Sequence, residues 1–118
     1  MGRPLRIEYP GALYHVTSRG NERKGIFIDA PDRKKFLSIL EDYHDRYGIL
    51  VHCYAMMGNH YHLVMETPQG NLLKVMYGIN SSYSGFFNCQ YGRSGHLFQF
   101  RYRGILVDKE AYLLELSR

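Results

Sequence analysis

Apolar and polar residues alternate along positions 12–19, and the chain then enters a Gly-Asn pair. A period of two residues predicts a strand that ends in a turn, with successive side chains on opposite faces. A short apolar segment, GIFID at 25–29, predicts a second extended piece. One face of the first strand would carry Leu13, His15, Thr17 and Arg19.

The next segment has the period of a helix. Within residues 30–48 the apolar positions recur at helical spacing, Pro31 lies near the start and Gly48 supplies the stop. This arrangement predicts an amphipathic helix that ends at the glycine. Its apolar positions are Phe36, Leu40, Tyr43 and Tyr47.

Two further strands follow, joined by a hairpin. Residues 49–57, ILVHCYAMM, predict a largely buried strand in which Cys53 is a small buried residue. Gly58 and Asn59 predict the turn into a strand at 60–67. Alternation in this last strand gives one face His60, His62, Val64 and Glu66, and the other face Tyr61, Leu63 and Met65.

The remainder of the chain predicts a helix over 70–90 despite two internal glycines, a strand at 104–107 and an amphipathic helix from 109 onward. The order of elements predicts one α+β domain, 1–118, of the ferredoxin-like or RRM-like type, with an antiparallel sheet and helices packed on one face. The other face would stay open for a nucleic acid. It would carry His15, Thr17, Arg19, His52, Tyr54, His60 and His62.

Composition narrows the class of protein. The chain has 118 residues, of which 45% are apolar and 22% charged, as is ordinary for one globular domain. It has no apolar run long enough for a transmembrane helix, no secretory leader, and only two cysteines. We therefore expect a cytoplasmic protein in a reducing compartment.

The formal charge of +4 arises locally. Residues 31–48 hold as many acids as bases, whereas 92–104 hold three arginines and no acid. In 96–103 basic residues alternate with aromatic ones, which is typical of an edge strand but also of a surface that holds phosphates and stacks on bases. We expect nucleic-acid contacts at Arg19, Arg23, Lys24, Arg93, Arg101 and Arg103.

His60 and His62 are candidate metal ligands. Residues two apart in a strand point the same way, so the two imidazoles can share one ion. In a chain with six histidines the pair alone is a weak motif, and a structural histidine is the alternative. No cysteine is placed to complete a zinc site, so the pair better suits Mg²⁺ or Mn²⁺ engaged with a phosphate. His15 is an alternative further ligand.

Three segments, taken together, resemble one known family: YHVTSRGN, MMGNHYHLV and GRSGHLFQFRYRGILVDKEAYLLELSR. They are similar to the IS200/IS605-like tyrosine transposases, in the branch that includes the REP-associated ones, over essentially the whole chain. In that family paired histidines form the HUH motif, which corresponds here to His60, Tyr61 and His62. Gly58 stands where the family usually has proline, a difference that affects turn rigidity more than chemistry.

The resemblance implies a transposase that cleaves and rejoins single-stranded, hairpin-forming DNA, working as a homodimer. The two histidines would hold a divalent cation, Mg²⁺ or Mn²⁺, at the scissile phosphate. A tyrosine would attack phosphorus and form a 5′-phosphotyrosine, which stores the bond energy for the reverse step. No nucleotide cofactor is then required.

The attacking tyrosine is not evident in the sequence. The family stretch usually reads ELSRYIHLNPVRA, and this chain reads ELSR and stops at Arg118, so we expect the tyrosine directly afterwards and a domain truncated at its C-terminal end. Tyr83 and Tyr112 are substitutes within the chain. Tyr83 is better explained as a packing residue or DNA contact, and Tyr112 as part of an apolar stripe with Leu113 and Leu116.

Two other functions remain open at this stage. The fold could serve as a catalytically inactive nucleic-acid-binding module that lacks the nucleophile, or as a metal-free RNA-binding protein. A covalent DNA adduct separates the transposase from the inactive module, and a requirement for divalent metal separates both from the RNA-binding protein.

Overall fold

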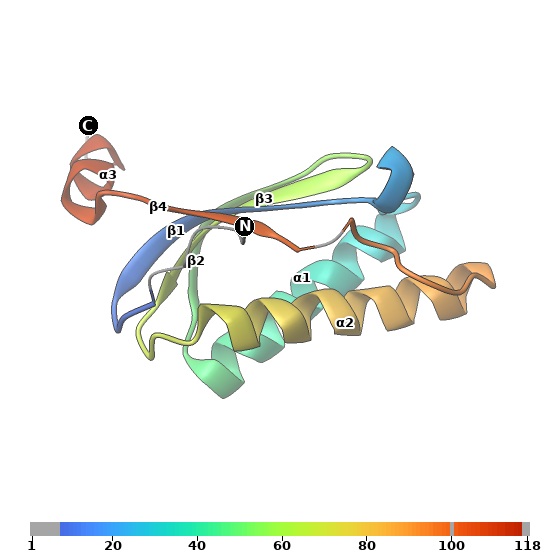
Figure 1. Ribbon diagram of the computed structural model, residues 1–118, viewed down its shortest axis with the longest axis horizontal. Coiled ribbons are helices and arrows are strands. Elements are labelled where there is room, and N and C mark those ends of the chain that lie inside the picture. Colours follow the sequence, from blue (N-terminus) through green and yellow to red (C-terminus); the bar gives the residue numbers. More distant parts are fainter. Residues whose placement is uncertain (1–7, 100, 117–118) are drawn as a thin grey trace, which may run out of the picture.

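The computed structural model describes residues 8–99 and 101–116. Four strands form one antiparallel sheet in the order β2-β3-β1-β4, and two long helices cover one of its faces (Figure 1). A 3-10 turn at Asn21–Arg23 follows the first strand. The elements are β1 Ala12–Arg19, α1 Ala30–Tyr47, β2 Leu50–Met56, β3 His60–Thr67, α2 Leu72–Tyr91, β4 Arg103–Leu106 and α3 Lys109–Leu116.

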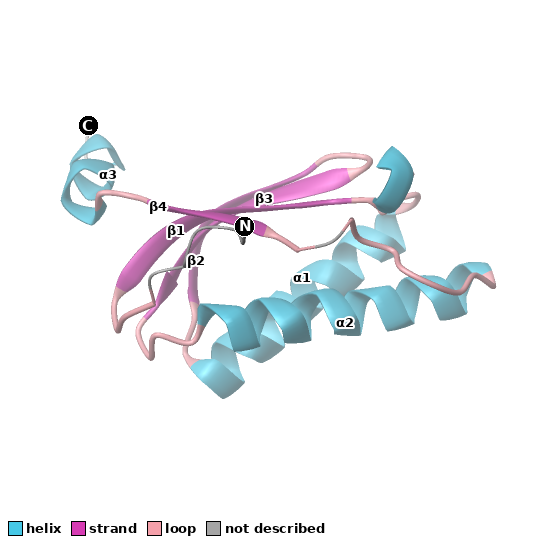
Figure 2. Cartoon of the chain, viewed as in Figure 1, coloured by secondary structure: helices cyan, strands magenta, loops and turns pink. Residues whose placement is uncertain are grey.

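This element order confirms the predicted α+β fold of ferredoxin-like type. Strands β1 and β3, which were predicted from their alternating apolar and polar residues, lie side by side at the centre of the sheet (Figure 2). Their alternate residues are buried under α1 and α2, and the intervening residues lie on the open face. No helix in the described residues is long and apolar enough to cross a lipid bilayer.

Helix α1 begins and ends where its sequence predicts. The Asp32 carboxylate accepts hydrogen bonds from the backbone amides of Ile28, at 2.8 Å, and Asp29, at 3.1 Å, which satisfies two amides at the helix start. Tyr91 at the end of α2 donates to the same oxygen at 2.7 Å. Gly48 ends the helix with φ of +71°, a conformation that favours glycine.

The core lies between the sheet and the two helices, and it is rich in aromatic rings. The rings of Phe36 and Tyr61 lie 4.5 Å apart, and Tyr83 meets Phe36 edge to face at 5.6 Å. One of the two glycines in α2, Gly78, lies against the Tyr43 ring, where an added Cβ would fall 2.2 Å from the hydroxyl oxygen. Close packing against Tyr43 leaves no room for a side chain here, which explains why the helix contains glycine despite its low helix propensity.

Strand β2 differs from its prediction as a largely buried strand. It lies at the edge of the sheet, most of its residues are exposed, and Cys53 is exposed as well. An irregularity between Val51 and Cys53 shifts the register by one residue, so Tyr54 is paired with Leu63, a residue of the helix-covered face. The prediction of Tyr54 on the open face was therefore wrong.

Two segments predicted to be extended do not form strands. Residues 25–29 run beside the hairpin turn, with the amides of Ile26 and Phe27 both donating to the Gly58 carbonyl. In the described part of the segment before β4, Phe98 forms an isolated bridge with Gly20. Leu97, Phe98 and Tyr102 are all buried, so the alternation of an edge strand is not followed there. Phe100 lies outside the described residues.

Candidate metal and nucleic-acid site

The open face of the sheet brings the two predicted histidines beside residues of β1 and β4. In the β1–β3 ladder Thr17 is paired with His62, and Arg19 with His60. Paired residues of an antiparallel ladder project to the same face. On the other side of β1, Arg103 is paired with Thr17. Three strands therefore build one polar surface around the histidine pair.

His62 is held on this surface by two neighbours on β1. Its Nδ1 lies 3.1 Å from Nε2 of His15 and 3.1 Å from Oγ1 of Thr17. The rings of His15 and His62 stack, with centroids 5.1 Å apart and planes inclined by 21°. Because Nδ1 is engaged by these neighbours, Nε2 is the nitrogen of His62 that remains for a ligand.

His60 is held by a different residue. Its Nδ1 lies 2.8 Å from Oδ1 of Asn59, whose amide nitrogen donates to the carbonyl of Arg23 at 3.3 Å. An amide oxygen only accepts, so the proton of His60 is on Nδ1 and Nε2 is free to ligate. The rings of His60 and His62 lie 5.0 Å apart at 84°, close enough to share one ion.

The electrostatics of the site favour neutral imidazole, the form that binds metal. Burial lowers the pKa of His62 below its usual value, and the electrostatic influence of His15, His60 and Arg19 lowers it further. His62 is therefore unprotonated at neutral pH. A metal ion would not have to displace a proton from it.

The donor set fits an ion that takes most of its ligands from elsewhere. In residues 8–99 and 101–116, no group of three or more histidine, cysteine, aspartate or glutamate side chains is arranged to hold a metal ion. Two imidazoles leave positions for water and phosphate oxygens, as suits Mg²⁺ or Mn²⁺ and not a closed structural zinc site. His15, the alternative further ligand, lies against His62 as a hydrogen-bond partner.

A cavity of about 450 Å³ opens beside His62. Its residues come from β1, β3, β4 and the segment before β4, and they include three of the six basic residues predicted to contact nucleic acid. Among the described side chains that line it, none is acidic. We call it the arginine cavity, and its lining is His15, Thr17, Arg19, His62, Gln99, Arg101, Arg103 and Ile105.

The other three predicted basic contacts lie outside the arginine cavity. Arg93 follows α2, where its guanidinium lies 5.5 Å from the centre of the Phe87 ring. Lys24 pairs with Glu22 at 3.2 Å, and Arg23 has a positive φ of 60°. The Asn59 contact brings this 21–24 turn beside the histidine pair.

The two tyrosines considered as nucleophiles occupy different places. Tyr83 is fully buried under the opposite face of the sheet, and its hydroxyl donates to the carbonyl of Ile26 at 2.5 Å. Burial also raises the pKa of the Tyr83 hydroxyl, which weakens it as a nucleophile. Tyr112 is on α3, where its hydroxyl lies 3.6 Å from Sγ of Cys53. Neither lines the arginine cavity.

Helix α3 is attached to the far end of β3. Lys109 donates to Glu66 at 2.7 Å, and His52 lies 3.1 Å from the other oxygen of the same carboxylate. These contacts keep the pKa of Glu66 below its usual value, with Lys109 contributing most. Glu66 shares the open face with the histidines, so the strand that carries the candidate ligands also fixes the last helix.

Sequence reasoning did not single out Asn59 or Gln99 as site residues. Asn59 was assigned only to the hairpin turn, although its position directly before His60 was a usable signal. Gln99 reaches the cavity because its backbone amide donates to the carbonyl of Arg19 at 2.8 Å, a tertiary contact that no local pattern reports.

The comparisons with known proteins identify the family of this chain. The family model described as IS200-like transposase matches residues 9–117, and the chain therefore belongs to the IS200-like transposase family. The predicted resemblance is confirmed at this level. A search of curated proteins gives no significant match.

Solved structures show the same fold. The structure of a REP-associated tyrosine transposase bound to a REP hairpin superimposes with a TM-score of 0.74 at 12% identity, covering 99% of this chain and 69% of that one. The crystal structure of a proposed transposase from Deinococcus radiodurans R1 gives a TM-score of 0.66 at 16% identity, covering 99% and 92%. At these identities the likeness concerns the fold.

Proposed function

We propose that this domain is an HUH-type transposase that binds single-stranded, hairpin-bearing DNA and cleaves and rejoins it through a tyrosine. The observation that carries the proposal is that His60 lies beside His62 on the open sheet face and that His62 lines the arginine cavity. Membership of the IS200-like transposase family supports DNA cleavage and rejoining as the chemistry of this site.

The arginine cavity accounts for the DNA-binding part. Arg19, Arg101 and Arg103 line the cavity beside His62. Each guanidinium group can donate two parallel hydrogen bonds to phosphate oxygens. Their charge is not cancelled by an acid among the described lining residues. A DNA backbone laid across the cavity would therefore be held beside the histidines without any need for base recognition.

The histidines account for the metal-assisted part. Nε2 of His60 and Nε2 of His62 would hold a Mg²⁺ or Mn²⁺ ion. Asn59 orients the ring of His60, and His15 and Thr17 orient the ring of His62. Such an ion, when bound, polarises the scissile phosphate and stabilises the charge that develops on it. The protein's own contribution is to present two imidazoles at fixed positions.

The covalent step requires a tyrosine. Its phenolate oxygen would form a bond to phosphorus as the bond to the 3′-oxygen breaks, leaving a 5′-phosphotyrosine and a 3′-hydroxyl that takes up a proton. Family resemblance assigns this role to the residue expected directly after Arg118. The reverse attack by a 3′-hydroxyl rejoins the strand and releases the tyrosine.

The expected partners follow from the same proposal. A related fold has been solved with a REP hairpin, so a DNA hairpin with single-stranded flanks is the substrate to test first. The two cysteines are free and exposed, which fits action in the reducing cytoplasm. The expected homodimer can be checked by sedimentation equilibrium with and without DNA.

One experiment tests the catalytic proposal. The 118-residue chain and a chain extended through the expected tyrosine are each incubated with Mn²⁺ and a labelled hairpin strand, and covalent adducts are resolved on a denaturing gel. The extended chain should form an adduct, while the 118-residue chain and an extended chain carrying His62→Ala should not. An adduct on the 118-residue chain would contradict the assignment, and Tyr83→Phe and Tyr112→Phe would then identify the residue attacked.

A second function is favoured by one observation. Among the described residues that line the arginine cavity there is no tyrosine, so this chain by itself presents a binding surface without an attacking phenol. An inactive nucleic-acid-binding module would still bind the hairpin strand through the arginine cavity. Such a module lacks the tyrosine, so its natural form would give no adduct with Mn²⁺ and the hairpin strand, which separates the two functions.

A further inference from the structure

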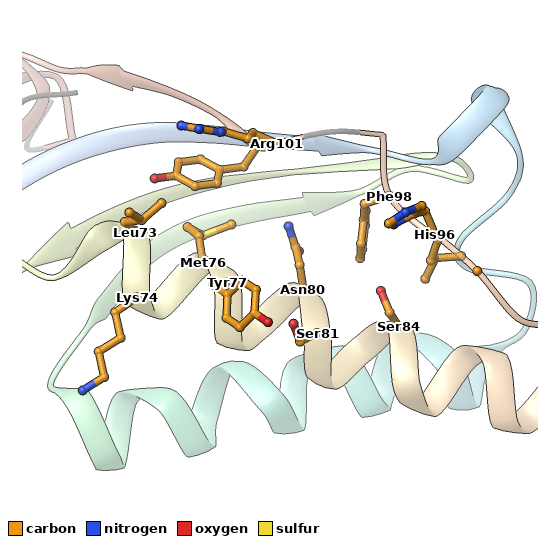
Figure 3. A pocket seen from close by; sticks show the side chains of 13 residues that line it. Leu73, Lys74, Met76, Tyr77, Asn80, Ser81, Ser84, His96, Phe98 and Arg101 are labelled. Carbon is orange, nitrogen blue, oxygen red and sulfur yellow. The ribbon is translucent and has the colours of Figure 1, made fainter. Parts of the chain in front are cut away.

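A second and larger cavity lies on the helix-covered side of the molecule. It has a volume of about 870 Å³ and runs between α2 and the segment at 95–102 that leads into β4 (Figure 3). We call it the α2 groove. It is lined by Leu73, Lys74, Met76, Tyr77, Asn80, Ser81, Ser84, Gly95, His96, Leu97, Phe98, Arg101 and Tyr102.

The chemistry of the α2 groove suits a planar, partly polar ligand. Met76 and Phe98 give the groove apolar walls (Figure 3). Tyr77, a residue that is 74% exposed, lies at the edge of the groove. The side chains of Ser81 and Ser84 add hydrogen-bonding groups along α2. An aromatic face beside donors and acceptors is the surface on which an unstacked nucleobase binds.

The charge of the groove specifies the ligand further. Arg101 lies at its rim and His96 opposite α2, whereas the side chain of Lys74 points away toward α1, where its nitrogen lies 5.0 Å from the centre of the Tyr47 ring (Figure 3). None of the described residues that line it is acidic. The groove therefore favours an anion attached to an aromatic base, which a nucleotide supplies and an apolar peptide does not.

Arg101 connects the groove to the candidate site. It lines the α2 groove and it also lines the arginine cavity beside His62, because the segment before β4 separates the two cavities. A DNA strand that leaves the histidines across this segment would keep its phosphates near Arg101 and enter the groove next. The same strand would thus occupy the arginine cavity and then the α2 groove.

We propose that the α2 groove binds unpaired nucleotides of the same DNA strand whose phosphate lies at the histidine pair, with a base stacked on Tyr77 and the backbone held by Arg101. This inference rests on the proposed function, since it names a further binding site for that substrate. It makes the groove the place where bases outside the hairpin stem are contacted.

The test combines paired variants with a mapping of contacts. Ser81 and Ser82 are adjacent, exposed residues of α2, but only Ser81 lines the groove, whereas Ser82 lies at a small cavity between the helices. Ser81→Glu should weaken binding of a hairpin with single-stranded flanks by roughly tenfold, and Ser82→Glu should not. Tyr77→Ala should do the same, with Tyr54→Ala, an exposed tyrosine on β2, as its control.

Photo-crosslinking then locates the bases. Strands with 5-iodouracil at single positions in the flanks are irradiated with the wild-type chain, and adducts are mapped by mass spectrometry. Crosslinks to Tyr77, His96 or Phe98 from flanking positions support the proposal. Equal affinity for all four variants, or crosslinks confined to other surfaces, would overturn it while leaving the proposed function intact. Failure of the wild-type chain to bind any single strand would overturn both.

Discussion

Oδ1 of Asn59 accepts a hydrogen bond from Nδ1 of His60 at 2.8 Å, and the same amide is fixed in orientation by its bond to the carbonyl of Arg23. The turn residue thereby sets which nitrogen of the neighbouring histidine carries the proton. Supporting contacts of this kind change metal affinity by about 10- to 100-fold when they are removed.

We predict that Asn59→Ala weakens Mn²⁺ binding by roughly tenfold with the fold intact, because His60 loses the acceptor that keeps Nε2 free. Asn59→Asp retains an acceptor and should retain most of the affinity. Titration calorimetry measures both, and circular dichroism checks the fold. Unchanged affinity in Asn59→Ala would show that the contact does not orient the ligand.

Removal of a ligand should have a larger effect than removal of its support. His60→Ala and His62→Ala should each reduce Mn²⁺ affinity by more than about tenfold, since either change leaves a single imidazole. His96→Ala is the matched control because His96 lines the α2 groove and not the arginine cavity. Equal Mn²⁺ affinity in the three variants and the wild-type chain would exclude this site.

The arginines of the cavity should determine how salt affects DNA binding. In the double variant Arg101→Ala, Arg103→Ala, the slope of log affinity against log salt should fall in magnitude by about 1.4, if each contacts one phosphate of a single strand. Arg46→Ala is the control, since Arg46 pairs with Asp42 on α1 at 3.0 Å. A slope equal to that of the wild-type chain would place these arginines outside the DNA contact.

Asp32 should make stability depend on acid pH. Burial raises the pKa of its carboxyl, but the hydrogen bonds from Tyr91, Asp29 and Ile28 and the charge of Arg33 outweigh it, so the pKa is lowered overall. A carboxyl with a lower pKa when folded stabilises the fold above its unfolded pKa of about 3.9, and this contribution is lost as pH falls through the folded value.

The corresponding variant is Asp32→Ala. It should lower the free energy of unfolding at pH 7 by about 1–3 kcal/mol, because two amides at the start of α1 lose their acceptor. Its loss of stability between pH 5 and pH 2 should also be smaller than that of the wild-type chain. Urea unfolding at several pH values measures both quantities, and parallel pH profiles would contradict the assignment.

Local pattern predicts the central part of the molecule well. Alternation in β1 and β3 places His15, His60 and His62 on one face, because both strands are covered by helices on one side only. The helix at 30–47 is predicted by its period, its Pro31 and its terminal glycine. Where one face of an element is buried and the other is exposed, the pattern of apolar and polar residues predicts which side chains lie on each face.

The remaining errors have a common origin in tertiary contacts. β2 reads as buried because it is apolar, yet it is an edge strand, and the irregularity beside His52 reverses which face its later residues occupy. The segment at 96–102 alternates, but it is held by isolated contacts to Gly20 and Asn21 instead of a ladder. Neither outcome is encoded within the segment itself.

The central position of β1 limits how this chain can change in length. Its residues alternate between the core, as with Tyr14 and Val16, and the open face of the sheet, as with His15 and Thr17. Insertion of one residue into this strand would exchange the two sets beyond it, burying polar side chains and exposing apolar ones. Insertions are therefore expected to accumulate in the turn at 21–24 and to be absent from β1 in functional variants.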